Sequence, residues 1–185
     1  DRWEHRVPKS QVTVRRLRAA GPDAYIALWR YLFSIDTVVS LTADPRPLDE
    51  PLTAMLVDSR ALHRRERSDL LWARLLDVPA FFGARGYSPG ATGTVVFEVE
   101  DPLGYASGRF ELSVDGAGRG ECRPLPDGAA QVRLPVDVLS GAALGGGDLA
   151  AAQQAGRLTE VEAGATSRLA LLLHTVRAPY NGTWF

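Results

Sequence analysis

Two glycine-rich stretches are the first residues whose type and spacing could do chemistry, because backbone N–H groups unshielded by side chains can bind phosphate. Gly116, Gly118 and Gly120 alternate with other residues, as in part of a nucleotide-binding loop. A phosphate site needs a helix N-terminus directly after the glycines. Turn-forming residues follow instead, so we favour a hairpin turn. Residues 145–147 are three glycines ahead of Asp148 and a predicted helix. Their geometry suits an anion better, but a loop between helices is the stronger interpretation.

Nucleophilic and metal chemistry have few candidates in this chain. The histidines are His5, His63 and His174, and the single cysteine is Cys122. No histidine has a serine, cysteine or carboxylate at the spacing of a known motif, so no catalytic triad is predicted. One cysteine excludes an internal disulfide, and three scattered histidines leave little for a zinc site. We expect Cys122 to be a small, half-buried strand residue, His63 to be solvated, and no metal cofactor.

The end of the chain is the last candidate, because it is aromatic where termini are usually polar. Its large side chains include Tyr180, Trp184 and Phe185. Burying each would stabilise the fold by roughly 1.5–3 kcal/mol. One interpretation is a docked tail that closes a core. The other is that docking carries the α-carboxylate of Phe185 to a fixed place.

The composition sets limits on the protein that could position these residues. The 185 residues are 45% hydrophobic and 23% charged, with a net charge of -1, which suits one large domain or two small ones. No basic excess supports a nucleic-acid or anionic membrane partner, and no apolar run is long enough to span a bilayer. Lys9 is the one lysine among 21 basic residues, a bias typical of GC-rich bacteria. We therefore expect a soluble, cytoplasmic, bacterial protein.

The first half of the chain alternates between strand and helix patterns. Residues 11–18 alternate apolar and charged side chains, which predicts a strand, and residues 37–43 are β-branched enough for another. Between them, Gly21-Pro22-Asp23 begins a predicted helix. Residues 70–76 are almost wholly apolar, which predicts a strand covered on both faces, and Asp77 is expected to cap a further helix. The predicted apolar face of the first helix comprises Tyr25, Leu28, Trp29, Leu32 and Phe33.

After Gly93 the pattern changes to short period-two runs. Apolar and polar residues alternate over residues 95–100, 109–115 and 131–136, which predicts an antiparallel sheet that is wet on one face. Three helical patterns follow, over residues 137–144, 148–155 and 165–176. The second half is thus predicted to be an α+β unit, a sheet covered by helices.

Several sequence blocks resemble one family. These are Leu28-Trp29-Arg30-Tyr31-Leu32, Pro47-Leu48-Asp49-Glu50-Pro51-Leu52 and Leu71-Trp72-Ala73-Arg74-Leu75-Leu76-Asp77-Val78-Pro79-Ala80. Together with the run at residues 95–101 and the terminal aromatic tail, they resemble the enhanced intracellular survival (Eis) family of GNAT N-acetyltransferases. The resemblance covers essentially the whole chain.

The resemblance implies a position for this chain within a three-part enzyme. Such enzymes have an N-terminal GNAT domain, a second GNAT-like domain and a domain similar to sterol carrier proteins. Residues 1–87 are similar to the last part of the second GNAT-like domain, and residues 88–185 to the sterol-carrier-like domain. The expected fold class is therefore α+β, a partial GNAT-like α/β unit followed by a sterol-carrier-like antiparallel sheet covered by helices. The acetyl-CoA pyrophosphate loop of the N-terminal domain is absent here, so this chain is not expected to bind acetyl-CoA alone.

One functional residue is implied by the resemblance. Family members use their C-terminal carboxylate as the base that receives the amine proton, and this maps onto Phe185. A free α-carboxylate has a pKa of about 3.3–3.7, low for a base near pH 7, and an apolar setting supplied by Trp184 and Tyr180 would raise it. The same carboxylate would attract a cationic amine. The implied acceptors are aminoglycosides or lysine side chains.

The resemblance also implies binding partners for this chain, and two other functions remain as alternatives. The resemblance implies the missing N-terminal GNAT domain, further copies of the chain in a homo-oligomer, and a cationic amine substrate. If the first half is only part of a domain, its sheet has an open edge that invites pairing. We therefore expect self-association, or cover of that edge by residues 1–10. The alternatives are a lipid or sterol carrier module with an apolar cavity in the second half, and a purely structural oligomerisation domain.

Overall fold

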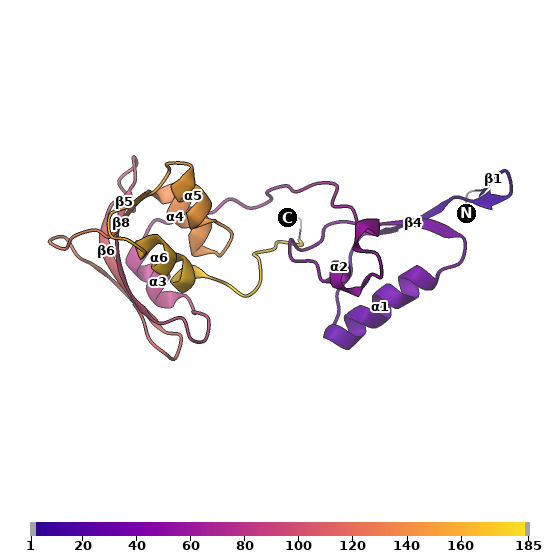
Figure 1. Cartoon of the computed structure of the whole chain (residues 1–185), viewed down its shortest axis with the longest axis horizontal. Helices are drawn as coiled ribbons and strands as arrows, with labels where there is room; N and C mark the ends of the chain where they lie inside the picture. Colours follow the sequence, from indigo (N-terminus) through magenta and orange to yellow (C-terminus); the bar gives the residue numbers. More distant parts are fainter. Residues whose placement is uncertain (1–2, 184–185) are drawn as a thin grey trace. The chain divides into compact units, whose positions relative to one another are not determined.

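The computed structural model describes residues 3–183, which fall into two compact units (Figure 1). The first unit comprises the described residues up to Glu50 together with Gly182 and Thr183. The second comprises Pro51–Asn181. The first unit has two separate strand pairs, the second has one five-stranded sheet, and each has its own buried residues.

The first unit is a strand–helix–strand arrangement preceded by a small hairpin. Strands β1 (Trp3–Glu4) and β2 (Val7–Pro8) pair with each other in antiparallel fashion. Strands β3 (Ser10–Val14) and β4 (Val38–Ala43) pair in parallel across helix α1 (Pro22–Ser34). Both strands and the helix confirm the predicted elements. Strands β1 and β2 pair only with each other and do not extend the β3–β4 sheet, while the expected self-association stays a prediction.

The residues at both ends of helix α1 explain where it begins and ends. Pro22 occupies the first turn, where its fixed φ suits a helix and its missing N–H is no loss. The helix ends at Ser34, whose hydroxyl donates to the Tyr31 carbonyl at 2.8 Å. Of the five apolar residues expected on one face, Trp29 is buried, while Leu28 and Phe33 are exposed. The predicted face is therefore only partly covered.

The second unit contains most of the regular structure. Its first elements are α2 (Leu52–Met55), the 3₁₀ turn η1 (Ser59–Ala61) and α3 (Val78–Ala84). Strands β5 (Gly93–Glu100), β6 (Gly108–Val114), β7 (Gly120–Pro124) and β8 (Val132–Pro135) follow. The last elements are α4 (Val136–Ala143), α5 (Leu149–Gln154), β9 (Thr159–Glu160) and α6 (Ala165–Leu173).

Five strands of this unit form one sheet in the order β7-β6-β5-β8-β9. Its neighbouring strands are antiparallel except β5 and β8, which pair in parallel with Phe97 opposite Val132. The expectation of a wholly antiparallel sheet is therefore wrong for this pair. After β7, the chain crosses to the other side of β5 before it forms β8. The helices lie on one face of the sheet (Figure 1). The opposite face carries charges, such as Glu98 paired with Arg133 at 3.1 Å.

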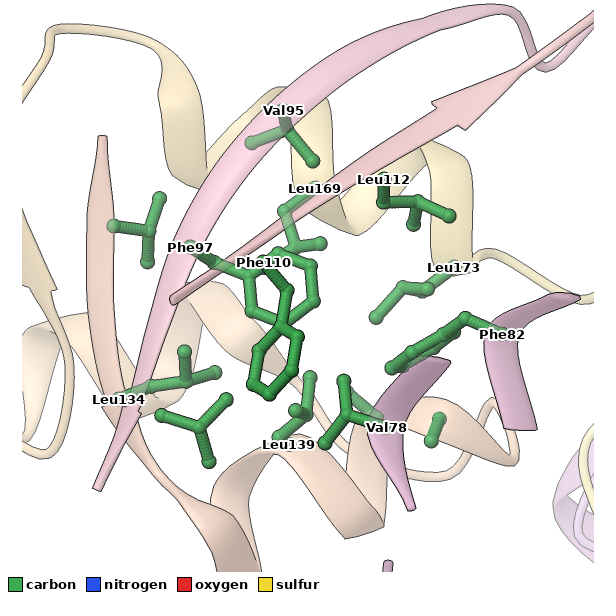
Figure 2. Close-up of a cluster of buried hydrophobic side chains, with 14 of the residues drawn as sticks. Val78, Phe82, Val95, Phe97, Phe110, Leu112, Leu134, Leu139, Leu169 and Leu173 are labelled. Carbon is green, nitrogen blue, oxygen red and sulfur yellow. The ribbon is translucent and has the colours of Figure 1, made fainter. Parts of the chain in front are cut away.

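The core lies between that sheet and its helices. The Phe97 and Phe110 rings are at its centre, with Phe82 of α3 beside them (Figure 2). The Phe82 and Phe97 ring centroids are 6.0 Å apart, as are those of Phe97 and Phe110. The period-two pattern explains this arrangement, because alternate residues of a strand point to one face. The buried strand residues are Val95, Phe97, Val99, Phe110, Leu112, Val114, Val132 and Leu134.

The strand predicted over residues 70–76 is not formed. Residues 62–76 have no regular structure, and most of their side chains are exposed. An apolar run becomes a strand only where other strands offer it backbone partners, and none of the strands between residues 3 and 183 does so here. The expected helix cap at Asp77 is confirmed, since its carboxylate accepts from the Ala80 N–H at 2.9 Å.

Candidate functional site

The first unit contains a cluster of three aromatic rings with the guanidinium of Arg46 beside it. Tyr25, Trp29 and Phe33 stand four residues apart on α1 and therefore share one face. Their successive ring centroids are 6.2 Å and 5.8 Å apart. The Cζ atom of Arg46 lies 5.7 Å from the Trp29 centroid and 6.0 Å from the Tyr25 centroid. A guanidinium at this distance is attracted by the ring faces.

Arg46 also ties together backbone and side chain around the cluster. Its Nε donates to Glu50 Oε2 at 2.6 Å, and its Nη1 donates to the Leu17 carbonyl at 3.2 Å. In the sequence, Arg46 is marked only by its position directly before the Pro47–Leu52 block. Arg46 thus fixes the loop before α1 relative to the segment after β4.

Two donors of this cluster lack acceptors among residues 3–183. They are the indole Nε1 of Trp29, whose residue is 1% exposed, and the Tyr25 hydroxyl. A buried donor without an acceptor is unfavourable by about 1–3 kcal/mol. Chemically, the cluster offers an apolar wall with two hydrogen-bond donors, which suits an oxygen acceptor such as a carbonyl or a carboxylate.

The candidate base Phe185 lies outside the described residues, as does Trp184, so its predicted role stays a prediction. The described part of the tail ends with Gly182 and Thr183, which belong to the same compact unit as the Arg46 cluster. Tyr180, expected to dock, is 46% exposed.

Neither glycine-rich stretch forms a phosphate site. Gly116, Gly118 and Gly120 lie in the β6–β7 hairpin, where Gly118 has a φ of 75° and the Asp115 carboxylate accepts from the Arg119 N–H at 3.0 Å. This confirms the predicted hairpin turn. Residues 145–147 form the predicted loop between α4 and α5. The N-terminus of the six-residue α5 is already capped, because Asp148 accepts from the Ala151 N–H at 2.9 Å.

The N-terminus of α1 also fits a pyrophosphate poorly. Pro22 has no N–H to donate, and Asp23 places negative charge in the first turn. The start of α1 therefore lacks the free N–H groups and the neutral first turn that favour a pyrophosphate, and the expectation that this chain does not bind acetyl-CoA alone stays a prediction.

The histidines and the cysteine occupy separate places. His5 and His63 are exposed, and His174 is an exposed residue at the end of α6. Cys122 lies on β7 and is partly buried, as expected. Burial, and then the negative charge of Asp77, raises the pKa of its thiol to about 12, which makes it a poor nucleophile.

The described residues contain neither a cluster of metal-ligating side chains nor a membrane-spanning helix. No group of three or more His, Cys, Asp or Glu side chains within residues 3–183 could hold a metal ion. In the same range, every helix is too short or too polar to cross a bilayer.

Asp101 is the buried charged residue that sequence reasoning missed. Its carboxylate is fully buried, accepts from the N–H groups of Leu103 and Ala106 at 2.9 Å each, and pairs with Arg74. Burial acts to raise the pKa of Asp101, but the N–H of Ala106, the N–H of Leu103 and the Arg74 guanidinium together hold it below its usual value. The signal available in the sequence was Asp101-Pro102-Leu103-Gly104, a turn directly after a strand.

Two family models match adjoining parts of the chain. An acetyltransferase (GNAT) domain matches residues 1–75, and a sterol carrier protein domain matches residues 78–182. The fold and these matches define the class of protein, an acetyltransferase-type segment followed by a sterol-carrier-type domain.

Relatives narrow the class further. The chain is 39% identical over 179 residues to an uncharacterized N-acetyltransferase of Streptomyces avermitilis, covering 96% of this chain and 42% of the relative. It is 38% identical over 146 residues to the N-acetyltransferase Eis of Mycobacterium tuberculosis, covering 76% and 34%. The crystal structure of Eis1 from Mycobacterium abscessus superposes with a TM-score of 0.80 at 30% identity, covering 94% of this chain and 43% of that one.

The chain belongs to the Eis-type family of GNAT N-acetyltransferases, in the region where the GNAT-like part meets the sterol carrier protein domain. It spans about two fifths of the length of the Streptomyces relative and of the Eis1 chain. The predicted family and the α+β fold class are thereby confirmed.

Proposed function

We propose that this chain is the C-terminal region of an acetyl-CoA-dependent N-acetyltransferase of cationic amines, with a GNAT-like part over residues 1–87 and a sterol-carrier-like domain over residues 88–185. The observation that carries the proposal is the pair of adjoining family matches, which together take in almost every residue. In the whole enzyme, acting in the cytoplasm as a homo-oligomer, this region would complete the acceptor site. Aminoglycosides or lysine side chains are the proposed acceptors.

The proposed chemical role of the chain is to take a proton from the amine. Alkyl amines are protonated near pH 7, since a lysine amine has a pKa of about 10.4, and an ammonium has no electron pair with which to attack. The α-carboxylate of Phe185 would receive that proton and would also attract the cation. A setting of low polarity would raise the carboxylate pKa toward the working pH.

The aromatic cluster of the first unit offers two hydrogen-bond donors of the kind that a carboxylate accepts from. Trp29 Nε1 and the Tyr25 hydroxyl offer donors that no acceptor within residues 3–183 takes up. Gly182 and Thr183 belong to the same unit.

The carrier alternative gains no support from the second unit. Its interior is occupied by packed side chains, with Phe82, Phe97 and Leu139 all at 0% exposure. The pocket beside α6, lined by residues including Leu171 and Leu172, has a volume of about 290 Å³. That is at the lower limit for small-molecule sites.

The test is an acetyl-transfer assay that follows release of free CoA thiol, with the full-length gene product and with residues 1–185 at equal concentrations. We expect turnover of aminoglycoside or lysine amines by the full-length protein alone. Calorimetric titration of residues 1–185 with acetyl-CoA is expected to give no binding. Micromolar binding, or turnover by residues 1–185, would contradict the proposal.

A further inference from the structure

Three glycines directly after helix α4, residues 145–147, lie against the segment that follows helix α6. We call these three residues the glycine loop. Gly145 caps α4 in a common way: its φ is 86°, its N–H donates to the Ala142 carbonyl at 2.9 Å, and the Gly146 N–H donates to the Gly141 carbonyl at 3.2 Å. A helix cap explains one glycine with a positive φ, but not three glycines in succession.

The missing side chains of the glycine loop leave room for the segment after α6. A Cβ at Gly145 would press on the Thr175 side chain, 2.7 Å from its Cγ2 and 2.9 Å from its Cβ. A Cβ at Gly146 would lie 3.1 Å from Pro179 Cγ, and one at Gly147 would lie 2.6 Å from a backbone nitrogen of α4. Carbon atoms that are not bonded to each other pack at about 3.5–4.0 Å, so each of these positions suits glycine alone.

A change of rotamer at Thr175 would not relieve the contact with a Cβ at Gly145. The position of the Thr175 Cβ is set by the backbone, and it would lie 2.9 Å from the new atom. The backbone at Thr175 would therefore have to move by about 0.6–1 Å to restore ordinary packing. Because the Thr175 hydroxyl donates to the Arg177 carbonyl at 2.9 Å, a shift at Thr175 also disturbs Arg177.

The start of this segment is held by hydrogen bonds from residues 85 and 88. Arg85 donates to the Ala143 carbonyl at the end of α4 and to the Leu173 carbonyl at the end of α6, at 2.8 Å and 2.9 Å. The Ser88 hydroxyl donates to the His174 carbonyl at 3.1 Å. The segment over residues 175–179 thus starts from a fixed point and has the glycine loop packed against it, so its path is defined by contacts within the second unit.

We propose that the glycine loop positions the base of the whole enzyme by fixing the path of residues 175–179. This rests on the proposed function, in which the α-carboxylate of Phe185 receives the amine proton. The glycines are positioning residues, because they act on the reaction only through the segment that they contact. A misplacement of about 1 Å caused far from the reacting atoms can lower a rate by about 10²-fold, and a Cβ at Gly145 would force a shift of that size.

Gly145→Ala in the full-length protein tests the proposal, with Gly90→Ala as the matched control. The φ of Gly90 is 85°, so both variants carry the same backbone strain, but a Cβ at Gly90 meets no non-neighbouring atom of residues 3–183 within 4 Å. We expect Gly145→Ala to lower kcat/KM for the amine about 10²-fold below that of Gly90→Ala. The KM for acetyl-CoA is expected to be unchanged. Equal kcat/KM in the two variants would overturn the proposal.

A second substitution at Thr175 tests whether the loss acts through this contact. Thr175→Gly in the Gly145→Ala background deletes the atoms that the new Cβ would meet, so we expect kcat/KM to recover by about 10-fold. Independent effects of the two substitutions would instead multiply. A double variant no more active than Gly145→Ala would overturn the proposal.

Gly146→Ala is a milder variant that tests the same contact if Gly145→Ala does not fold. Its φ is outside the left-handed region, and its Cβ would meet Pro179 at 3.1 Å. We expect Tm to change little and kcat/KM to fall by about 10-fold, in proportion to the smaller shift. Unchanged kcat/KM in Gly146→Ala would overturn the proposal.

Trypsin cleavage after Arg177 measures the path of the segment without any turnover. Arg177 is exposed, and cleavage is faster where a segment departs more often from its packed position. We expect cleavage at this bond, followed by mass spectrometry, to be about 10-fold or more faster in Gly145→Ala than in Gly90→Ala. Equal rates would show that the glycine loop does not hold the segment, and would overturn the proposal.

The two kinds of measurement separate this proposal from the proposed function. Faster cleavage after Arg177 in Gly145→Ala, combined with undiminished kcat/KM, would refute the positioning role and leave the proposed function in place. Absence of turnover in the native full-length protein would refute the proposed function, and the positioning role with it.

Discussion

Replacing Arg85 with methionine is expected to destabilise the second unit by about 2–4 kcal/mol, because one guanidinium closes the C-termini of two helices. Its Nη1 donates to the Ala143 carbonyl of α4 at 2.8 Å, and its Nη2 donates to the Leu173 carbonyl of α6 at 2.9 Å. The last carbonyls of a helix have no partner within the helix. Two charge-assisted hydrogen bonds contribute about 1.5–3 kcal/mol each, and partial exposure of the guanidinium reduces their sum to about 2–4 kcal/mol.

The ring of Tyr87 adds to this interaction. The Arg85 Cζ lies 5.0 Å from the ring centroid, and the Tyr87 hydroxyl donates to the Phe82 carbonyl at 2.7 Å. Methionine keeps the apolar stem over the ring, so the variant removes mainly the charge and its hydrogen bonds. For a unit of this size each kcal/mol corresponds to about 3–5 °C in Tm, so the expected loss is about 6–20 °C by circular dichroism.

Arg133→Met is the matched control. Arg133 Nε lies 3.1 Å from Glu98 Oε2 on the wet face of the sheet, and its side chain is 53% exposed. An exposed pair contributes about 0–1 kcal/mol, so this variant is expected to melt within a few degrees of the native chain. If Arg85→Met lowers Tm no more than Arg133→Met does, the role assigned to Arg85 is refuted.

Two further predictions follow from the ionisable groups. The N–H of Arg119 lowers the pKa of Asp115, and the N–H of Thr166 lowers that of Glu160; the resulting stability is complete above the unfolded-state pKa of about 4 and is lost as pH falls through the lower folded-state values. Tm is therefore expected to fall between pH 5 and pH 2, less steeply in Glu160→Gln, and an equal slope in that variant would contradict the assignment. Because burial raises the pKa of Cys122 to about 12, Ellman's reagent at pH 8 is expected to label the folded chain about 10³-fold more slowly than the unfolded chain, and equal labelling rates would contradict it.

The sequence predicted elements best where the pattern and the packing agree within one unit. Strands β5 and β6 follow the period-two runs, because Phe97 and Phe110 point to the same core as their alternate neighbours. The cap at Asp77 was predictable, since a carboxylate three residues ahead of a free N–H fixes a helix start locally.

Long-range pairing could not be predicted in the same way. Residues 70–76 have the composition of a buried strand, yet no strand among residues 3–183 lies beside them. The parallel pairing of β5 with β8 joins residues far apart in the sequence, such as Phe97 and Val132. Local sequence patterns do not indicate such a pairing. An apolar composition favours burial of a segment, but the segment forms a strand only where neighbouring strands pair with its backbone.

In the candidate site too, local features could be predicted from the sequence and long-range contacts could not. The aromatic residue types at the end of the chain were enough to predict a tail that docks, although Phe185 itself lies outside the described residues. The sequence indicates a turn at Asp101 but not its ion pair, and it does not indicate the contacts of Arg46, because the partners Arg74 and Trp29 stand 27 and 17 residues away. A charged residue becomes a fixed part of a structure through such contacts, and these follow only from the fold.

The central claim is that the α-carboxylate of Phe185 is the base of the whole enzyme, and its most direct test is kcat/KM for a full-length protein extended by one alanine after Phe185. The extension converts the carboxylate into an amide and moves the charge by up to about 3.6 Å, so we expect kcat/KM to fall by about 10²–10⁴-fold. Deletion of Phe185 is expected to be nearly as harmful, with Tm almost unchanged in both variants. Full activity in the extended enzyme would contradict the account and leave the tail with a packing role only.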